Sequence, residues 1–234
     1  EELPYNNIIA INNNSAILHY QNYQRSKNKK SHSFLIDAGA MINGYASDIT
    51  RSYAFENNEF STLIEAMNQL QLSIVNSIKI DMTFIELHEN AHEKVADLIK
   101  LFNFATGSKE SLIKNKITNI FFPHGLGHFL GIQVHDVGGF LKNSKGDLIK
   151  KSDQHPYLRL HKKIAIDQVF TIEPGFYIID QLINFAKVNG TFKLLNQKKL
   201  DWLRPYGGVR IEDNIRIKKN SIENLTRDAF SNIT

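Results

Sequence analysis

The feature that most constrains the fold is a predicted β-hairpin at residues 33–53, whose two strand-like runs each carry an aspartate. The dipeptide Asn43-Gly44 between these runs is among the strongest short-range hairpin signals. If residues 41–44 form a four-residue loop, Asp37 lies directly opposite Asp48. If Asn43 and Gly44 alone form the turn, the two aspartates are diagonal neighbours on one face. Either register directs two carboxylates at one spot, so we expect a positive charge between them.

Helical segments follow the first strands. Residues 8–11 and 16–20 are apolar runs separated by an Asn-rich stretch, which predicts a further hairpin at the start of the chain. Apolar residues recur at helical spacing over residues 63–78 and 87–98, and Thr83 with Glu86 forms a capping box before the second helix. Residues 107–119 are compatible with a short helix or a loop. The sequence then becomes Gly-rich over residues 121–139, where we expect irregular backbone that passes close to another segment.

Strand-like patterns return near the end of the chain. Residues 169–173 predict a strand that ends in Glu173, closed by a Pro-Gly turn and followed by a strand at 176–179. Residues 206–217 alternate with period 2, which places Arg210 and Glu212 on one face. The order of strands, then helices, then strands, with no linker between them, predicts one α+β domain with an antiparallel sheet, not a doubly wound parallel sheet.

Composition excludes several classes of protein. The 234 residues are 42% hydrophobic, enough for a sizeable core, and they contain no Cys, which excludes disulfides and thiolate metal sites and fits a reducing, cytoplasmic location. No apolar run approaches the roughly 20 residues of a membrane-spanning helix. The net charge is +4, but Lys and Arg are scattered, and the densest basic run, residues 25–30, is interpreted as a solvated loop. We therefore expect neither nucleic acid nor membrane as a partner.

Four carboxylates carry the chemistry that the residues suggest. Each has a simple structural explanation alone, as a turn former, a strand end or half of an ion pair. Together with an imidazole they form an oxygen-rich set of formal charge −4, which two divalent cations would neutralise: Asp37, Asp48, Glu173 and Glu212. Such sets favour Mn²⁺, Mg²⁺, Fe²⁺ or Co²⁺ over a structural zinc. Two cations roughly 3.5–4 Å apart lower the pKa of a shared water, so the hypothesis is metal-assisted hydrolysis of a bond that the carboxylates alone do not identify.

Six ordered motifs resemble those of the pita-bread metallopeptidases of family M24, across essentially the whole chain. They read FLIDAG at 34–39, YASDITR at 45–51, HGLGH at 124–128, VHDVG at 134–138, TIEPG at 171–175 and GGVRIED at 207–213. Further stretches at 4–10, 16–20, 157–159 and 204–208 are similar to the bacterial Xaa-Pro dipeptidase (prolidase) branch. The resemblance implies a pita-bread fold, in which a curved antiparallel sheet carries helices on its outer face.

The same resemblance implies five metal ligands: Asp37, Asp48, His128, Glu173 and Glu212. Asp48 and Glu212 would bridge two divalent ions, Asp37 would hold one of them, and His128 with Glu173 would hold the other. Mn²⁺ is the cation expected first, with Co²⁺, Fe²⁺ and Mg²⁺ as alternatives.

Catalytic and substrate roles also follow from the resemblance. His135 is similar to a histidine that contacts the scissile carbonyl, and Glu173 would move a proton between the water and the leaving nitrogen. Arg159 would grip the C-terminal carboxylate of proline, because a guanidinium fork binds a carboxylate bidentately. Three more residues would line the substrate pocket: His19, His124 and Arg210. For His124 the alternative is a satisfied histidine that steadies the Gly-rich turn.

The expected function is release of proline from Xaa-Pro dipeptides. The alternatives are an aminopeptidase of the same fold that acts on longer Xaa-Pro peptides, and a non-catalytic or decaying pita-bread fragment. Relatives place a separate N-terminal domain and two helices before the segment that matches Pro4, so residues 1–234 are expected to correspond to the catalytic domain without them. That leads us to expect apolar surface on the outside of the sheet, and the resemblance allows a homodimer.

Overall fold

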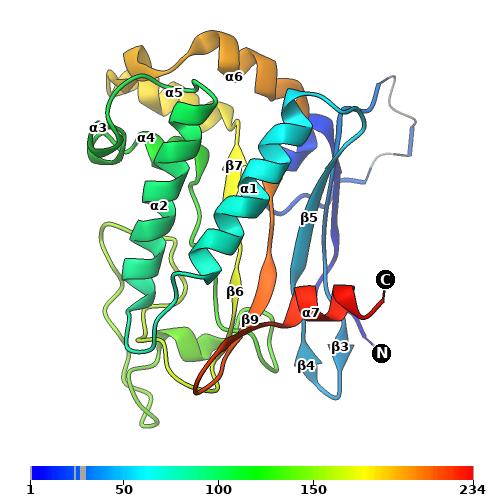
Figure 1. The fold of residues 1–234 in the computed structure, drawn as a ribbon, viewed down its shortest axis with the longest axis vertical. Coiled ribbons are helices and arrows are strands. Elements are labelled where there is room, and N and C mark those ends of the chain that lie inside the picture. The colour runs from blue at the N-terminus through cyan, green and yellow to red at the C-terminus, as the bar shows by residue number, and fades with distance from the viewer. Residues whose placement is uncertain (1, 24, 27–29, 234) are drawn as a thin grey trace.

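The computed structural model describes residues 2–23, 25–26 and 30–233. The middle of the basic run predicted as a solvated loop, residues 27–29, therefore lies outside the described residues. All the strand pairings among these residues are antiparallel, so the α+β prediction is confirmed (Figure 1). The predicted order of strands, helices and strands is incomplete, because helices at Asp180–Val188 and Gln197–Leu203 interrupt the second group of strands.

The predicted central hairpin forms, and its register is the diagonal one. It consists of β2 (Ser33–Ala38), β3 (Met41–Ile42), β4 (Tyr45–Ala46) and β5 (Ile49–Ala54). Ile42 pairs with Tyr45, and the turn residues between them have positive φ values, 52° for Asn43 and 82° for Gly44. Two positive φ angles are what a type I′ hairpin turn requires, and Asn-Gly supplies them. The same register continues to the pair Asp37–Thr50, which leaves Asp48 diagonal to Asp37.

The hairpin predicted at the start of the chain is wrong in its second half. Strand β1 (Ile8–Ile11) forms and pairs with β2, but a 3₁₀ helix, η1 (Asn12–Ala16), follows it, and residues 17–20 are not a strand. The reason is tertiary. Asn12 takes a φ of 59°, and its side-chain oxygen accepts hydrogen bonds from the backbone N–H groups of His32 and Ser33. These hydrogen bonds direct the chain after Ile11 away from β1, and β2 is the strand that pairs with β1.

A second antiparallel ladder runs through the C-terminal part of the chain. Its strands are β6 (Val169–Ile172), β7 (Gly175–Tyr177), β8 (Gly208–Arg210), β9 (Asp213–Ile217) and β10 (Ile222–Asn224). Ile172 pairs with Asp213 and Gly175 pairs with Arg210, so one register passes through both strand pairs. That register places Glu173 directly opposite Glu212.

The Pro-Gly turn predicted after Glu173 is therefore wrong. The chain continues in the same direction from β6 into β7, and Pro174 interrupts only the ladder because it has no N–H to donate. Gly175 serves close packing instead of a turn, since a Cβ at this position would lie 2.1 Å from the hydroxyl oxygen of Tyr177.

Seven α-helices lie in the described part of the chain: α1 (Glu59–Val75), α2 (Phe84–Leu101), α3 (Lys109–Lys114), α4 (Ile117–Phe121), α5 (Asp180–Val188), α6 (Gln197–Leu203) and α7 (Leu225–Ser231). Short 3₁₀ turns are η2 (Val137–Phe140), η3 (Thr191–Leu194) and η4 (Arg204–Tyr206). The capping box before α2 is confirmed, because Thr83 Oγ1 accepts from the N–H of Glu86 and the Glu86 carboxylate accepts from the N–H of Thr83.

Helices α1 and α2 cover the outer face of the second ladder (Figure 1). Their apolar stripes are fully buried, and the ring of Phe84 packs edge-on against Phe170 of β6 at 5.3 Å between centroids. The first sheet differs. Its outward face carries Ile9, which is 40% exposed, and Tyr53, which is 52% exposed. These two side chains leave some apolar surface exposed on this face.

The two sheets are joined at the middle of the molecule. Thr50 of β5 forms a bridge to Glu212, whose N–H donates to the Thr50 carbonyl at 3.0 Å. Beside this bridge, the Arg51 guanidinium pairs with the buried Asp213 carboxylate at 2.6 Å. The Arg227 Nε also lies 2.7 Å from the Asp213 carboxylate, so two guanidinium groups balance the charge of Asp213. Because of this bridge, carboxylates from both sheets face the same cavity.

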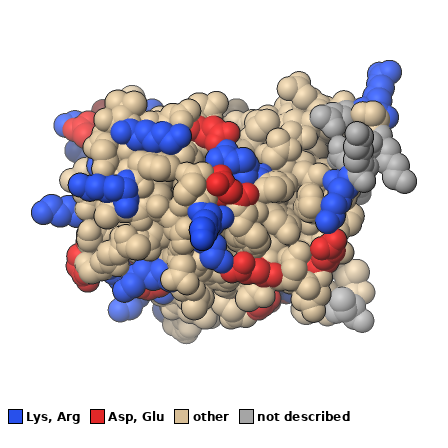
Figure 2. Space-filling model, turned by 90° about the horizontal axis from the view of Figure 1, so that it is seen from above, with Lys and Arg blue, Asp and Glu red and all other residues tan. Residues whose placement is uncertain are grey.

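Charged side chains alternate in sign on the face seen in Figure 2. Ion pairs such as Lys199–Glu59 and Arg204–Asp180 connect the helices on the surface. Among the described residues, no helix has the length and apolar character needed to cross a membrane.

Candidate metal centre

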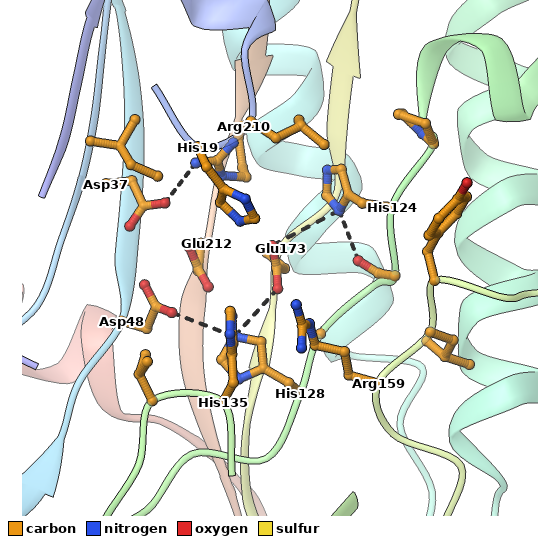
Figure 3. Close-up of a pocket in the computed structure, with 18 of the residues that line it drawn as sticks. His19, Asp37, Asp48, His124, His128, His135, Arg159, Glu173, Arg210 and Glu212 are labelled. Atoms are coloured by element: carbon orange, nitrogen blue, oxygen red, sulfur yellow. Dashed lines mark hydrogen bonds and ion pairs between the residues drawn. The ribbon is translucent and has the colours of Figure 1, made fainter. Parts of the chain in front are cut away.

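All ten residues singled out in the sequence line one cavity of about 760 Å³ (Figure 3). They come from both ladders and from the irregular segments between them: His19, Asp37, Asp48, His124, His128, His135, Arg159, Glu173, Arg210 and Glu212. The fold therefore brings together residues that lie up to 193 positions apart in the chain, from His19 to Glu212.

The four carboxylates and His128 approach one another closely. Ligand atoms of Asp37, Asp48 and Glu212 lie within 4.8 Å of one another, and those of His128, Glu173 and Glu212 form a second such group. Glu212 is common to both groups. The arrangement offers two neighbouring cation positions that share at least one carboxylate.

Close backbone packing places His128 in this cavity. A Cβ on Gly127 would lie 1.9 Å from the carbonyl oxygen of Thr171, so only glycine lets this segment approach β6. The Thr171 N–H then donates to the His128 carbonyl at 2.9 Å. The expectation of a Gly-rich segment in close approach to another is confirmed.

The orientation of the His128 ring leaves one nitrogen free for a cation. Its Nδ1 lies 3.0 Å from the carbonyl oxygen of Phe129, which can only accept, so Nδ1 carries the proton. The Nε2 atom faces the carboxylates of Asp48 at 3.4 Å and Glu173 at 3.5 Å, which favour a proton on it while no cation is bound. A cation that replaces this proton would bind at Nε2 while the Phe129 carbonyl holds Nδ1, the arrangement usual for a metal-binding histidine.

Burial makes the charges of the glutamate pair costly. It raises the pKa of Glu173 to about 7 and that of Glu212 well above its ordinary value, and neighbouring carboxylates add to both shifts. Glu212 Oε2 accepts a hydrogen bond from the Thr50 hydroxyl at 2.6 Å, but the buried Oε1 has no hydrogen-bond partner among the described residues. An ionised carboxylate in this position needs a cation.

The aspartates are better compensated. Burial raises the pKa of Asp37, while the Arg210 guanidinium, 2.6 Å away, opposes that shift. For Asp48, burial also acts to raise the pKa, but the hydrogen bond and charge of His128 outweigh it, so the pKa of Asp48 is lowered. The pKa of His128 rises correspondingly, because Asp48 and Glu173 outweigh the opposing effect of burial.

The donor set fits two hard divalent cations. It consists of carboxylate oxygens and one imidazole nitrogen, and it contains no thiolate. The unpartnered Oε1 of Glu212 and the raised pKa values of both glutamates indicate that the protein alone does not stabilise the ionised carboxylates. Cations bound here would remove that cost.

Tyr5 is a site residue that the sequence interpretation missed. Its hydroxyl lies 2.7 Å from an oxygen of Asp37 and 2.5 Å from an oxygen of Asp48, so it links the two aspartates. Burial and the nearby carboxylates raise the pKa of this hydroxyl, which keeps its proton available as a hydrogen-bond donor. No local pattern marks Tyr5, because its partners lie 32 and 43 residues away.

His124 belongs to a hydrogen-bond chain that ends at Asp37. Its Nδ1 lies 2.8 Å from the Gly125 carbonyl oxygen, and its Nε2 lies 3.0 Å from the Tyr177 hydroxyl. That hydroxyl accepts from Arg210 at 3.2 Å, and Arg210 in turn holds Asp37. Burial lowers the pKa of His124 to about 3, so the ring is neutral. Tyr177, fully buried at the centre of this chain, was also missed from the sequence.

Three further residues lie at the open side of the cavity. The His135 ring is perpendicular to that of His128 at 4.4 Å between centroids, and burial lowers its pKa to about 4. Arg159 points into the cavity in Figure 3, and no acidic residue of the described chain pairs with it. His19 projects from the opposite wall (Figure 3).

Comparison with known proteins identifies the family of this chain. A sequence model of metallopeptidase family M24 matches residues 1–219. Xaa-Pro dipeptidase of Shewanella woodyi is 50% identical over 231 residues, which are 99% of this chain and 53% of the relative. Xaa-Pro dipeptidase 2 of Idiomarina loihiensis is 49% identical over 99% of this chain and 52% of its own length. The chain thus spans about half the length of the curated relatives it matches.

Solved structures share the fold. Zinc-substituted Escherichia coli aminopeptidase P in complex with product superposes with a TM-score of 0.74 at 25% identity, over 97% of this chain and 44% of that one. Pseudomonas aeruginosa aminopeptidase PepP gives a TM-score of 0.73 at 26% identity, over 96% and 45%. The predicted pita-bread fold is confirmed.

Proposed function

Because this chain belongs to metallopeptidase family M24, we propose that it hydrolyses Xaa-Pro dipeptides with two divalent cations held in the cavity. The observation that carries the proposal is the convergence of four carboxylates and one correctly oriented imidazole beside the Arg159 guanidinium, which has no acidic partner among the described residues. Relatives about 50% identical are named Xaa-Pro dipeptidase, which supports the substrate class.

The proposed ligands are the five residues of the two overlapping groups: Asp37, Asp48, His128, Glu173 and Glu212. Asp48 and Glu212 would serve both cations, Asp37 would serve one, and His128 with Glu173 would serve the other. When bound, two such cations lower the pKa of a shared water and polarise a carbonyl oxygen. Arg210 and Tyr5 hold the aspartates in place through the contacts described above.

Two side chains are proposed to act on the peptide itself. Glu173, whose carboxylate faces the cavity beside His128, takes a proton from the attacking water and delivers it to the proline nitrogen. His135 is neutral at pH 7, so a ring N–H is available to donate to the oxygen of the scissile carbonyl as negative charge develops there.

Arg159 is proposed to select dipeptides. A guanidinium binds a carboxylate through two parallel hydrogen bonds, and in a dipeptide the only free carboxylate follows the proline. Among the described residues Arg159 has no acidic partner of its own to displace. Longer peptides present an amide at this point and cannot use the guanidinium in the same way.

We extend the proposal to Mn²⁺ as the preferred cation, because the oxygen-rich donor set suits it. The absence of Cys fits a cytoplasmic protein. A homodimer is the assembly proposed from the family resemblance, and light scattering on the purified protein tests it.

The decisive experiment compares a Xaa-Pro dipeptide with the corresponding Xaa-Pro-Xaa tripeptide after removal of metal and addition of Mn²⁺. The wild-type protein should favour the dipeptide. Arg159→Ala should lower kcat/KM for the dipeptide about 10- to 100-fold, as expected for a lost charge-assisted hydrogen bond, and should affect the tripeptide much less. The matched control is Lys151→Ala, which removes another positively charged side chain from the cavity wall. It should leave kcat/KM unchanged for both the dipeptide and the tripeptide.

Two outcomes would redirect the assignment. Equal losses on both peptides in Arg159→Ala, with good tripeptide turnover, would indicate an aminopeptidase of the same fold. Bound Mn²⁺ without hydrolysis of either peptide would support a non-catalytic module.

A further inference from the structure

A second cluster of histidines lies outside the cavity. His88 and His92 are one turn apart on α2, and His155 reaches them from the irregular segment between η2 and β6. The ring centroids of His88 and His92 are 4.6 Å apart, and those of His88 and His155 are 4.7 Å apart. Phe122 packs against both His88 and His124, so its ring separates this cluster from the cavity.

The polar atoms of this cluster are poorly satisfied. His88 and His92 are 3% and 5% exposed. Nδ1 of His88 and both ring nitrogens of His155 are buried without a hydrogen-bond partner among the described residues, although the Glu89 carboxylate lies 3.5 Å from His155 Nε2. Buried imidazoles that serve only packing usually face backbone carbonyls or hydroxyls. Here three of them face one another.

The one outward hydrogen bond orients its ring toward the cluster. Nδ1 of His92 lies 3.0 Å from the hydroxyl oxygen of Thr118, so Nε2 of His92 points inward and lies 3.3 Å from Nε2 of His88. A partner on the outer nitrogen is the usual companion of a histidine that binds metal through its inner nitrogen. Burial lowers the pKa of His92 to about 4 and that of His88 well below its ordinary value, so both rings are neutral.

The spacing of the helical pair suits a tetrahedral cation. One ring nitrogen from each histidine lies within 4.8 Å of the other two. In a tetrahedral site with Zn–N bonds of about 2.0–2.1 Å, ligand nitrogens are about 3.3–3.4 Å apart. The observed separation of 3.3 Å between the two Nε2 atoms is of this size.

We propose that His88, His92 and His155 form a third metal site, distinct from the carboxylate cavity, that binds Zn²⁺. Three neutral nitrogen donors favour Zn²⁺ over Mn²⁺ or Mg²⁺, whereas the oxygen-rich cavity has the opposite preference. Water completes the coordination. The Glu89 carboxylate beside His155 supplies negative charge and orients that ring.

Such a site would fasten a segment that matters for substrate binding. His155 lies four residues before Arg159 in the same irregular segment, and its carbonyl accepts a hydrogen bond from Leu158 at 3.1 Å. Zn²⁺ bound to His155 and to two residues of α2 ties this segment to the helix. The ion thereby limits the movement of the backbone that carries Arg159.

The test uses the full chain with the cavity ligands disabled. In the background variant Asp48→Asn/Glu212→Gln, titration with Zn²⁺ against a chromophoric chelator should show one tightly bound equivalent. Co²⁺ in the same variant should give the intense visible absorption of a tetrahedral ion. Adding His155→Asn should weaken Zn²⁺ binding at least about 10- to 100-fold and abolish the Co²⁺ band. Adding His32→Asn, a histidine outside the cluster, should change neither.

The design remains decisive if a helix variant misfolds. A second variant, His88→Asn in the same background, should also weaken Zn²⁺ binding. Because His88 is buried, the fold of this variant is checked by circular dichroism. His155 lies in the irregular segment, so His155→Asn provides the independent measurement. Zn²⁺ should raise the Tm of the background variant and fail to raise it after His155→Asn. Absence of a bound equivalent in the background variant, or Zn²⁺ affinity unchanged by His155→Asn, would overturn the proposal.

Discussion

The β2/β5 hairpin and the β6/β9 ladder each deliver two carboxylates to the same cavity, but the protein compensates the two pairs differently. Asp37 and Asp48 are diagonal across their hairpin, and Arg210 and His128 stand beside them. Glu173 and Glu212 are directly opposite in their ladder, and burial raises both pKa values. The hairpin pair is partly neutralised by the protein, whereas the ionisation of the glutamate pair is unfavourable unless cations bind.

The surroundings of the two pairs differ in the same sense. The glutamates flank strands that are covered by α1 and α2, and Glu212 is 1% exposed, whereas the Glu173 side chain is 18% exposed where it faces the cavity. The hairpin belongs to a sheet whose outer face is partly exposed. Low dielectric strengthens both the repulsion between unpaired carboxylates and their attraction to a cation. Glu212, the most buried of the four carboxylates and the one whose Oε1 has no hydrogen-bond partner among the described residues, is therefore the position where metal binding should have the largest energetic consequence.

Removing one carboxylate from each pair should have the largest effect on activity. Glu212→Gln and Asp48→Asn each remove a proposed bridging ligand, so metal-dependent hydrolysis should fall on the order of a thousandfold or more, because several kcal/mol of charge stabilisation are lost. Steady-state kinetics with Mn²⁺ and metal analysis of the purified variants measure this. Turnover like that of the wild type in either variant would contradict the dinuclear site.

The same two variants sharpen the comparison in the metal-free protein. Asp48→Asn deprives His128 of its partner and should lower the free energy of unfolding at pH 7. Glu212→Gln removes a carboxyl whose ionisation is costly, so the free energy of unfolding should stay unchanged or rise. Equal destabilisation in urea unfolding would show that the two pairs are compensated alike.

A smaller effect is expected from breaking the hydrogen-bond chain that connects the two regions. Tyr177→Phe leaves Arg210 and His124 without a shared hydroxyl, which should cost about 1–3 kcal/mol of stability and weaken metal binding about 10-fold. Urea unfolding and a metal titration measure both quantities. Tyr157→Phe alters a residue that is 72% exposed and serves as the control, with no expected change.

The smallest effect concerns the pH dependence of stability without metal. The folded pKa of Glu173 is about 7, above its ordinary value of 4.5, so between these pH values the folded state holds a proton that the unfolded state has released. The contribution of Glu173 to stability should therefore decline as the pH rises from about 4.5 to about 7. Urea unfolding across this range should show a shallower decline in Glu173→Gln and, with Mn²⁺ present, in the wild type. Identical slopes in the metal-free wild type and variant would refute the shift.

Short-range patterns in the sequence were reliable where they depend on neighbouring residues. The Asn43-Gly44 turn, the capping box at Thr83 and the close approach at Gly127 all formed as expected. The Pro-Gly pair after Glu173 misled because proline and glycine also interrupt a ladder without reversing the chain. The Asn-rich stretch after β1 misled because Asn12 binds the backbone of residues 32 and 33, which no local pattern reveals.

The site shows the same division. Every predicted site residue lines the cavity, because each stands in a motif of several residues. Tyr5 and Tyr177 were missed because each acts through partners far away in the chain. The histidine cluster on α2 combines a helical pair with a residue more than 60 positions later, so its meeting could not be expected from spacing alone.

The sequence by itself determined the periodicities, the turn chemistry and the motifs, and with them the fold class and the identity of the carboxylates, since these depend on contacts within a few residues. Only the tertiary structure decided that Glu212 of the glutamate pair also lies beside both aspartates, that one pair is diagonal and the other opposite, and which charges stay uncompensated. Those outcomes depend on strand register and on burial, and both are set by packing between segments remote in the chain.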